Sequence, residues 1–241
     1  MLRAPAVKPG RVFLFYLFRS FRGDFLKFIM SYSCGKDSTL ALHKMLAAGH
    51  KPAALLVMFN ESAGRSYFHG ADRPMLEAYG RALGLPVRPV PTAGETYHLA
   101  METALVRITR ETGAEAICFG DIDIQANRDW CEARARAAGL KPIFPLWRRD
   151  RRENVREVMD LGYRCIIKSI HNTLLPRSLL GRVLDGGAAA EMARHGIDIC
   201  GENGEYHTLA VDGPIFRQPL PFALGKVLDF GEYSVIEVDV R

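Results

Sequence analysis

Residues 31–38, SYSCGKDS, constrain what this chain can fold into more than any other stretch. An apolar run over residues 25–30 precedes them, and a helical pattern over residues 39–48 follows. A strand, a turn of small residues and a helix, in that order, present backbone N–H groups and the positive end of a helix dipole to an anion. Lys36 adds a mobile positive charge, and the neighbouring serine hydroxyls can donate hydrogen bonds. The run therefore predicts a phosphate-binding turn.

The spacing within the run decides between types of phosphate loop. A Walker A loop requires glycine five positions before its Gly-Lys pair and Ser or Thr after the lysine. Those positions hold Met30 and Asp37, and no G-x-G-x-x-G dinucleotide fingerprint is present. The run instead resembles the PP-loop, S-G-G-K-D-S, of the N-type ATP pyrophosphatases, which cleave ATP between the α- and β-phosphates. An ordinary glycine-containing turn remains the alternative.

Cys34 is the one departure from the PP-loop pattern, because it stands at the first glycine position. If that position requires a positive φ, the cysteine is strained there, and if the glycine only provides space, the cysteine is tolerated. A third interpretation makes Cys34 a sulfur-transfer nucleophile, because helix N-termini lower thiol pKa values. No C-x-x-C pair accompanies it, which disfavours that chemistry.

Composition sets only broad limits on function. The 241 residues suffice for one large domain or two small ones, and 48% hydrophobic with 24% charged residues is ordinary for a globular protein. The net charge of +5 permits an anionic partner, but no basic patch interleaved with aromatic residues points to nucleic acid. Five cysteines without a paired spacing predict a reducing, cytoplasmic location. No apolar run approaches the roughly 18 residues of a membrane span, so no membrane partner is expected.

Strands and helices alternate through the first part of the chain, which predicts an α/β fold with a doubly wound, Rossmann-like parallel sheet. We expect an N-terminal extension over residues 1–24, a PP-loop ATP-binding domain over 25–147 and a smaller α+β domain over 148–241. Pro89 limits residues 87–90 to a short strand at best. In the last domain, helices are predicted over 177–184 and 186–195, followed by short, partly antiparallel strands.

A second constellation of polar residues, ENGEYHT, occupies residues 202–208. Its carboxylates and imidazole could bind an amine, carry a proton or hold Mg²⁺. The alternative is a solvated turn, because Asn-Gly is a common turn dipeptide.

Five motifs occur in one order along the chain: the PP-loop, GDI at 120–122, WCE at 130–132, PLW at 145–147 and GENGEYHT at 201–208. Together they resemble the diphthine–ammonia ligase family over about residues 25–217. Two main motifs spaced about 165 residues apart are far more specific than either alone.

This resemblance implies ATP-dependent amide formation. A carboxylate attacks the α-phosphate of ATP to give an acyl-adenylate and pyrophosphate, and ammonia then displaces AMP. In the family the acceptor carboxylate belongs to diphthine, a modified histidine on translation elongation factor 2. The implied cofactors are ATP and Mg²⁺, the implied location is the cytoplasm, and an oligomer is possible.

The resemblance also implies residue roles. The nucleotide-binding residues are Ser33, Cys34, Gly35, Lys36, Asp37, Ser38, Gly120 and Asp121. The substrate-binding residues are Glu202, Asn203, Glu205 and His207. The catalytic residues are Lys36, Glu205 and His207. Asp37 is expected to bind Mg²⁺ or to cap the helix, Gly120 to let the nucleotide approach the backbone, and Glu205 or His207 to accept a proton from ammonia.

Two other functions stay open at the level of sequence. The same ATP chemistry could act on a different acceptor, either a small-molecule carboxylate or a tRNA base. A non-catalytic ATP sensor would bind the nucleotide without turnover, and release of AMP and pyrophosphate separates it from an enzyme.

Overall fold

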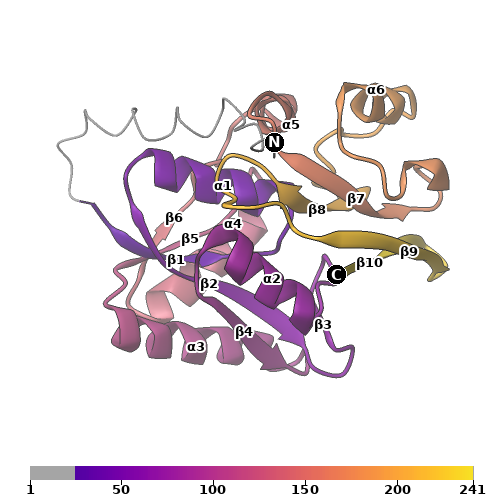
Figure 1. Ribbon diagram of the computed structural model, residues 1–241. Helices are drawn as coiled ribbons and strands as arrows, with labels where there is room; N and C mark the ends of the chain where they lie inside the picture. Colours follow the sequence, from indigo (N-terminus) through magenta and orange to yellow (C-terminus); the bar gives the residue numbers. More distant parts are fainter. Residues whose placement is uncertain (1–24, 241) are drawn as a thin grey trace, which may run out of the picture.

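The computed structural model describes residues 25–240, and the predicted extension over residues 1–24 lies outside them. Residues 27–143 build a six-stranded sheet in the order β3-β2-β1-β5-β6, with β4 also paired to β2 (Figure 1). Every pair is parallel except β2 with β3. The strands are β1 (Lys27–Ser31), β2 (Lys51–Asn60), β3 (Arg65–Ser66), β4 (Val87–Thr92), β5 (Ala116–Cys118) and β6 (Lys141–Ile143).

The predicted doubly wound parallel sheet is confirmed. The chain moves from β1 to β2 on one side and later returns to place β5 on the other side of β1. The point where the strand order reverses is where such sheets bind ligands, beside the carboxyl ends of the strands. Here those ends belong to β1 and β5, which lead into the PP-loop and into Gly120.

Helices cover both faces of this sheet, because neighbouring strand residues point to opposite sides. Phe28 and Met30 belong to a core cluster with α1 and α2, whereas Ile29 belongs to a second cluster with α3 and α4. The helices are α1 (Lys36–Ala47), α2 (Arg73–Leu83), α3 (Tyr97–Thr112) and α4 (Gln125–Ala137). The ends of two of them follow from local signals: Asp72 caps α2 through a bond from the Met75 N–H, and Gly84 and Gly113 end α2 and α3 in the left-handed conformation.

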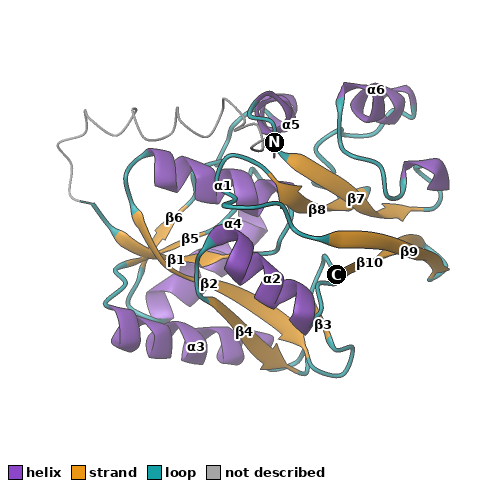
Figure 2. Ribbon diagram, in the orientation of Figure 1, coloured by secondary structure: helices purple, strands orange, loops and turns teal. Residues whose placement is uncertain are grey.

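The rest of the chain builds a separate antiparallel sheet in the order β8-β7-β10-β9 (Figure 2). Its elements are α5 (Arg151–Asp160), β7 (Arg164–His171), the 3-10 helix η3 (Arg177–Leu179), α6 (Gly186–Arg194), β8 (Tyr206–Asp212), β9 (Phe222–Asp229) and β10 (Tyr233–Val240). The first core cluster continues into this sheet through Ile167 and Leu209, so that α1 and α2 share one core with both sheets. The domain boundary at residue 147 stays a prediction.

Two expectations for local structure were wrong. The helix over 177–184 is only the short η3, because Leu180 is extended, Gly181 has a φ of 78° and Val183 forms a bridge with Ile166. The strand at 87–90 extends to Thr92 despite its prolines. It pairs only with β2, and an edge strand tolerates proline because one side of its ladder is free.

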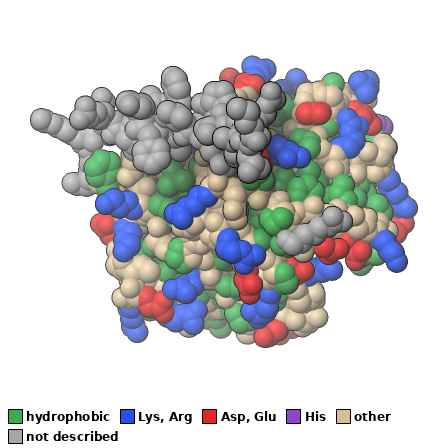
Figure 3. All heavy atoms as spheres, viewed as in Figure 1, with side chains coloured by type: hydrophobic (Ala, Val, Ile, Leu, Met, Phe, Trp, Pro, Cys, Tyr) green, Lys and Arg blue, Asp and Glu red, His purple; other side chains and the backbone are tan. Residues whose placement is uncertain are grey.

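The view in Figure 3 shows no face of the molecule that is covered by charges of one sign. Lys and Arg side chains are interspersed there with acidic and hydrophobic ones and are not gathered into one patch. Within residues 25–240, no helix is both long and apolar enough to cross a membrane.

Candidate active site

The PP-loop turn connects β1 to α1 in a strained conformation at Cys34. This residue has a φ of 72°, its side chain is fully buried, and its carbonyl accepts a 2.9 Å hydrogen bond from the backbone N–H of Ala210. A residue with a Cβ is disfavoured at such a φ, whereas glycine adopts it freely. The position therefore does require the left-handed conformation, and the cysteine is strained there.

The thiol of Cys34 is not set up as a nucleophile. Burial raises its pKa well above the ordinary value, the opposite of the lowering expected at an exposed helix N-terminus. The other four cysteines, at 118, 131, 165 and 200, are also buried and free. The sulfur-transfer interpretation therefore has no reactive thiol to support it.

Lys36 opens α1 and is fixed at both ends. Its backbone N–H donates to Thr208 Oγ1 at 3.1 Å, and its Nζ lies 2.7 Å from Asp37 Oδ2 and over the ring of Tyr206. Burial alone would lower its pKa, but Asp37, Tyr206 and Cys200 outweigh that effect and hold the pKa above the ordinary value. The lysine is therefore a buried, permanent positive charge beside the start of the helix.

The two loop serines contact each other. Ser33 Oγ and Ser38 Oγ lie 3.0 Å apart, and Ser38 Oγ donates to the Gly35 carbonyl at 3.2 Å. Gly35 itself is covered by His69, whose ring would lie 2.4 Å from a Cβ at that position. The turn is therefore held by its own side chains and by a packed imidazole.

A cavity of about 330 Å³ opens beside this turn and brings together most of the predicted site. Its lining includes Ser33, Lys36, Asp37, Ser38, Gly120, Asp121, Glu202 and His207, all predicted from the sequence. Four other predicted residues, Cys34, Gly35, Asn203 and Glu205, do not line it. The two distant motifs thus both line one cavity.

Gly120 has a packing role that the sequence did not predict. A Cβ there would lie 3.0 Å from the Ser38 backbone nitrogen and 3.1 Å from the Asp37 carbonyl carbon. The glycine therefore lets the end of β5 pack against the backbone of the first turn of α1, and the close approach of a nucleotide to Gly120 stays a prediction.

Three carboxylates on the cavity wall influence one another. Burial, with smaller contributions from Asp37 and Asp121, raises the pKa of Glu202 to about 7 against the opposing effects of Lys36 and Arg151. A carboxyl group with this pKa changes protonation near neutral pH and can exchange a proton with a substrate.

Asp121 is held in a similar environment. Burial raises its pKa and the nearby Asp37 adds to the rise, although the Cys131 thiol, 3.7 Å from Oδ2, favours the charged form. Asp37 does not cap α1, since no side chain caps that helix and one oxygen of Asp37 is paired with Lys36.

Glu205 supports the loop and does not face the cavity. Its Oε2 accepts from the Asn203 backbone N–H at 3.0 Å, and its Oε1 accepts from Asn203 Nδ2 at 3.1 Å. Gly201, with a φ of 71°, leaves room for the Tyr206 ring, which would lie 2.7 Å from a Cβ. The Glu205–Asn203 pair therefore shapes the turn that presents Glu202.

The imidazole rings of two cavity-lining histidines meet edge to face. The rings of His69 and His207 are 5.1 Å apart, and His69 Nδ1 lies 2.6 Å from the Thr208 carbonyl. Because a carbonyl only accepts, Nδ1 carries the proton and Nε2 is the basic nitrogen. Burial lowers the pKa of His69 to about 3 and that of His207 to about 4, so both rings are neutral near pH 7.

Arg151 ties the second loop to the first sheet. Its guanidinium contacts Asp123 at 2.6 Å, in the segment after β5, and Asp198 at 2.5 Å, just before the second motif. Asp198 in turn accepts from the Cys200 backbone N–H at 2.9 Å. This bridge holds in place the segment that leads into the Glu202 loop.

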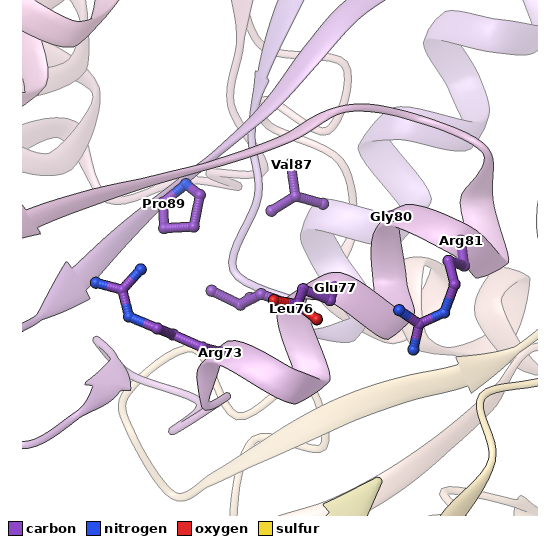
Figure 4. Close-up of a pocket in the computed structure, with 7 residues that line it drawn as sticks. All are labelled: Arg73, Leu76, Glu77, Gly80, Arg81, Val87 and Pro89. Atoms are coloured by element: carbon purple, nitrogen blue, oxygen red, sulfur yellow. The ribbon is translucent and has the colours of Figure 1, made fainter. Parts of the chain in front are cut away.

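Another hollow, of about 490 Å³, lies between α2 and β4 (Figure 4). Arg73, Glu77, Arg81, Val87 and Pro89 border it, and it shares no residue with either motif. The chemistry-bearing residues therefore gather in the cavity at the switch point and not in this larger hollow.

Comparison with protein families shows to which family the chain belongs. Residues 26–142 match the diphthamide synthase N-terminal domain, and residues 150–232 match the diphthamide synthase C-terminal domain. The two matches follow in order and together span most of the sequence. This chain belongs to the diphthamide synthase family.

Curated relatives in the diphthamide synthase family carry one name. The chain is 26% identical to the diphthine–ammonia ligase of Danio rerio over 214 residues, covering 78% of this chain and 83% of the relative. It is 26% identical to that of Homo sapiens over 212 residues, covering 78% and 79%. The Schizosaccharomyces pombe ligase is 22% identical over 242 residues, covering 90% of this chain and 39% of that protein. The resemblance drawn from the motifs is confirmed, and the chain is an enzyme of the ligase class.

Within this diphthamide synthase fold, Phe68 is a site residue that sequence reasoning did not select, and for His69 the sequence favours a nucleotide contact and a structural role equally. Both line the cavity from the turn between β3 and α2. That turn has no periodic pattern and lies outside every motif, so only its position after the carboxyl end of β2 could have pointed to it.

Proposed function

We propose that the protein adenylates the carboxylate of a diphthine-like acceptor with release of pyrophosphate, and then forms the amide with ammonia and releases AMP. One observation carries this proposal: the PP-loop and the Glu202 loop line one cavity and are joined by the bond from Lys36 N–H to Thr208 Oγ1. The names of the relatives supply the reaction class.

In this proposal, the first turn of α1 binds the phosphates of ATP and stabilises the departing pyrophosphate. The helix N-terminus offers backbone N–H groups, Lys36 offers a fixed charge, and the serine hydroxyls of Ser33 and Ser38 can reorient toward phosphate oxygens. As the bond between the α- and β-phosphates breaks, charge accumulates on the departing pyrophosphate. A lysine already charged and positioned stabilises that charge without rearrangement.

The residues present fit Mg²⁺ bound together with a nucleotide. No group of three or more His, Cys, Asp or Glu side chains within residues 25–240 forms a complete metal site. Mg²⁺, however, commonly uses one or two carboxylates and takes its other ligands from phosphates and water. Asp37 and Asp121, whose proximity raises the pKa of Asp121, would hold such an ion, which would neutralise phosphate charge.

Glu202 is the proposed proton acceptor in the amide-forming half. Ammonia attacks the acyl carbon, the bond from that carbon to the AMP oxygen breaks with its electron pair leaving on AMP, and one proton passes from nitrogen to Glu202. The pKa of about 7 suits this transfer, whereas Glu205 is engaged with Asn203 and the His207 pKa of about 4 makes it a weak base. Glu205 and His207 therefore take positioning and lining roles in this proposal.

The deciding experiment supplies ATP, Mg²⁺, ammonium and elongation factor 2 carrying diphthine, and measures AMP, pyrophosphate and the amide. Lys36→Ala is expected to abolish AMP release. Lys44→Ala is the matched control, since Lys44 lies on the same helix and is also 2.7 Å from a carboxylate, that of Glu157. Absence of AMP with every acceptor would favour the ATP sensor. AMP release with a small carboxylate or a tRNA, but not with the factor, would favour a different acceptor.

A further inference from the structure

A second cavity, of about 430 Å³, adjoins the first on the side away from α1. Phe68, His69 and His207 line both cavities. The other lining residues are Arg65, Gly70, Lys168, Ser169, Leu228, Phe230, Tyr233 and Val235. The two spaces therefore meet at the histidine pair, and the second one is built by the β3–α2 turn together with β7, β9 and β10.

The walls of the second cavity combine apolar surface with positive charge. Phe68, Phe230 and Tyr233 contribute rings, and Arg65 and Lys168 contribute cations, while no carboxylate lines it. Lys168 is almost fully buried and its Nζ donates to the Ile236 carbonyl, which fixes the amine in place. Such a lining suits an arm that ends in a carboxylate and contacts aromatic rings along its length.

Two exposed phenylalanines stand on the walls of this cavity. Phe68 is 70% exposed and Phe230 is 67% exposed, and they follow β3 and β9, strands of different sheets. Phe68 also has a φ of 66°, in a three-residue turn closed by the bond from His69 N–H to the Tyr67 carbonyl at 2.8 Å. A bulky residue is rarely kept in this conformation, and strain of this kind is characteristic of ligand-binding segments.

We propose that the second cavity receives the acceptor carboxylate as a side chain of a protein, with Phe230 and Phe68 contacting the polypeptide around it. This inference rests on the proposed function. Arg65 attracts the carboxylate, and the arm passes toward His69 and His207, where the cavity holding the nucleotide begins. Exposed aromatic side chains beside a pocket are typical anchors for a protein partner, whereas a small acceptor needs no contact beyond the cavity walls.

The test measures steady-state amidation by the full-length protein with two acceptors: elongation factor 2 carrying diphthine, and free diphthine. Phe230→Ala is expected to raise the KM for the factor about tenfold, with kcat and the KM for ATP unchanged. Arg65→Ala should raise the KM for both acceptors, and Arg65→Lys should restore part of the affinity. Phe25→Ala is the control, because Phe25 is 54% exposed but lies before β1, at the opposite end of the strands from the cavities.

Calorimetric binding of the factor without ammonium separates failure of the inference from failure of the proposed function. A wild-type protein that makes no AMP overturns the proposed function. Binding or KM for the factor that is equal in wild type, Phe230→Ala and Arg65→Ala overturns the inference. Free diphthine used as well as the factor, with the same response to Phe230→Ala, overturns the assignment to a protein-borne acceptor.

Discussion

The backbone N–H of Lys36 donates a 3.1 Å hydrogen bond to the side-chain hydroxyl of Thr208, 172 positions later in the chain. The same threonine offers its carbonyl to His69. One residue of the second motif therefore holds both the start of α1 and the imidazole that covers Gly35, and the geometry of the phosphate turn depends on a strand of the other sheet.

Replacing Thr208 by valine should remove this support without changing the size of the side chain. The Lys36 N–H would be left buried without its partner, so the free energy of unfolding should fall by about 1–3 kcal/mol. ATP affinity should fall as well, because the first turn of α1 loses its anchor. Chemical denaturation and calorimetry measure the two effects. Thr208→Ser keeps the hydroxyl and should behave as wild type; equal losses in both variants would contradict this explanation.

Changing Cys34 to glycine should relieve backbone strain, at the expense of a small buried side chain. Cys34→Ala removes the sulfur but keeps the Cβ at a φ of 72°. Cys34→Gly should therefore be more stable than Cys34→Ala by about 1 kcal/mol, and should retain ATP turnover. Thermal unfolding of the two variants provides the comparison. An alanine variant as stable as the glycine variant would show that the conformation is not strained.

Gly120→Ala should disturb the phosphate turn through the backbone of α1. The added methyl group would meet the backbone of Ser38 at 3.0 Å, and neither backbone can yield cheaply. A loss of about 1–3 kcal/mol in stability and weaker ATP binding are expected. Gly186→Ala is the matched control, because nothing lies within 4 Å of a Cβ there. If Gly120→Ala binds ATP like the control, the close packing of β5 against α1 is not needed.

Amidation should depend on pH through Glu202. Its pKa of about 7 means that the proton-accepting form appears as the pH rises through that value, so at a constant concentration of free ammonia the rate should rise until about pH 8 and then level off. Glu202→Gln should remove this limb and most of the activity. Pyrophosphate release and amide formation measured from pH 5.5 to 9 test the profile; an unchanged profile in the variant assigns the proton to another group.

The same carboxyl group should make the folded protein less stable at high pH. Its pKa is about 7 in the folded state and near 4.5 in the unfolded chain, so the folded state holds the proton more tightly. The cost is absent below about pH 4.5, grows between the two values and is complete above about pH 7. Glu202→Gln should therefore stabilise the protein at pH 8 by about 1–2 kcal/mol and have little effect at pH 4, as denaturant titrations at both pH values would reveal.

Sequence reasoning worked best where one residue type has one physical consequence. Glycine is a typical helix end, and Gly84 and Gly113 end α2 and α3; a continuous apolar run is typical of a strand buried on both faces, and most of β2 is buried. It failed at residues 177–184, where apolar spacing suits a helix but Gly181 and a bridge at Val183 impose an extended path.

For the site, the motifs predicted which segments meet but not which way each side chain points. Glu205 and Glu202 are the same residue type and only three positions apart, yet one is bonded to Asn203 and the other faces the cavity. For His69 the sequence could not decide between a nucleotide contact and a structural role, because its placement depends on a contact with the Thr208 carbonyl, which no local pattern encodes.

The shared core has a consequence for synthesis of the chain. Leu40 and Leu42 of α1 belong to a cluster that also includes Leu209 and Val211 of β8. While the ribosome makes the intervening segments, this apolar surface lacks its partner and is open to unwanted association. The first half of the nascent chain should therefore require protection by chaperones until β8 emerges, and truncated products that end before that strand should aggregate.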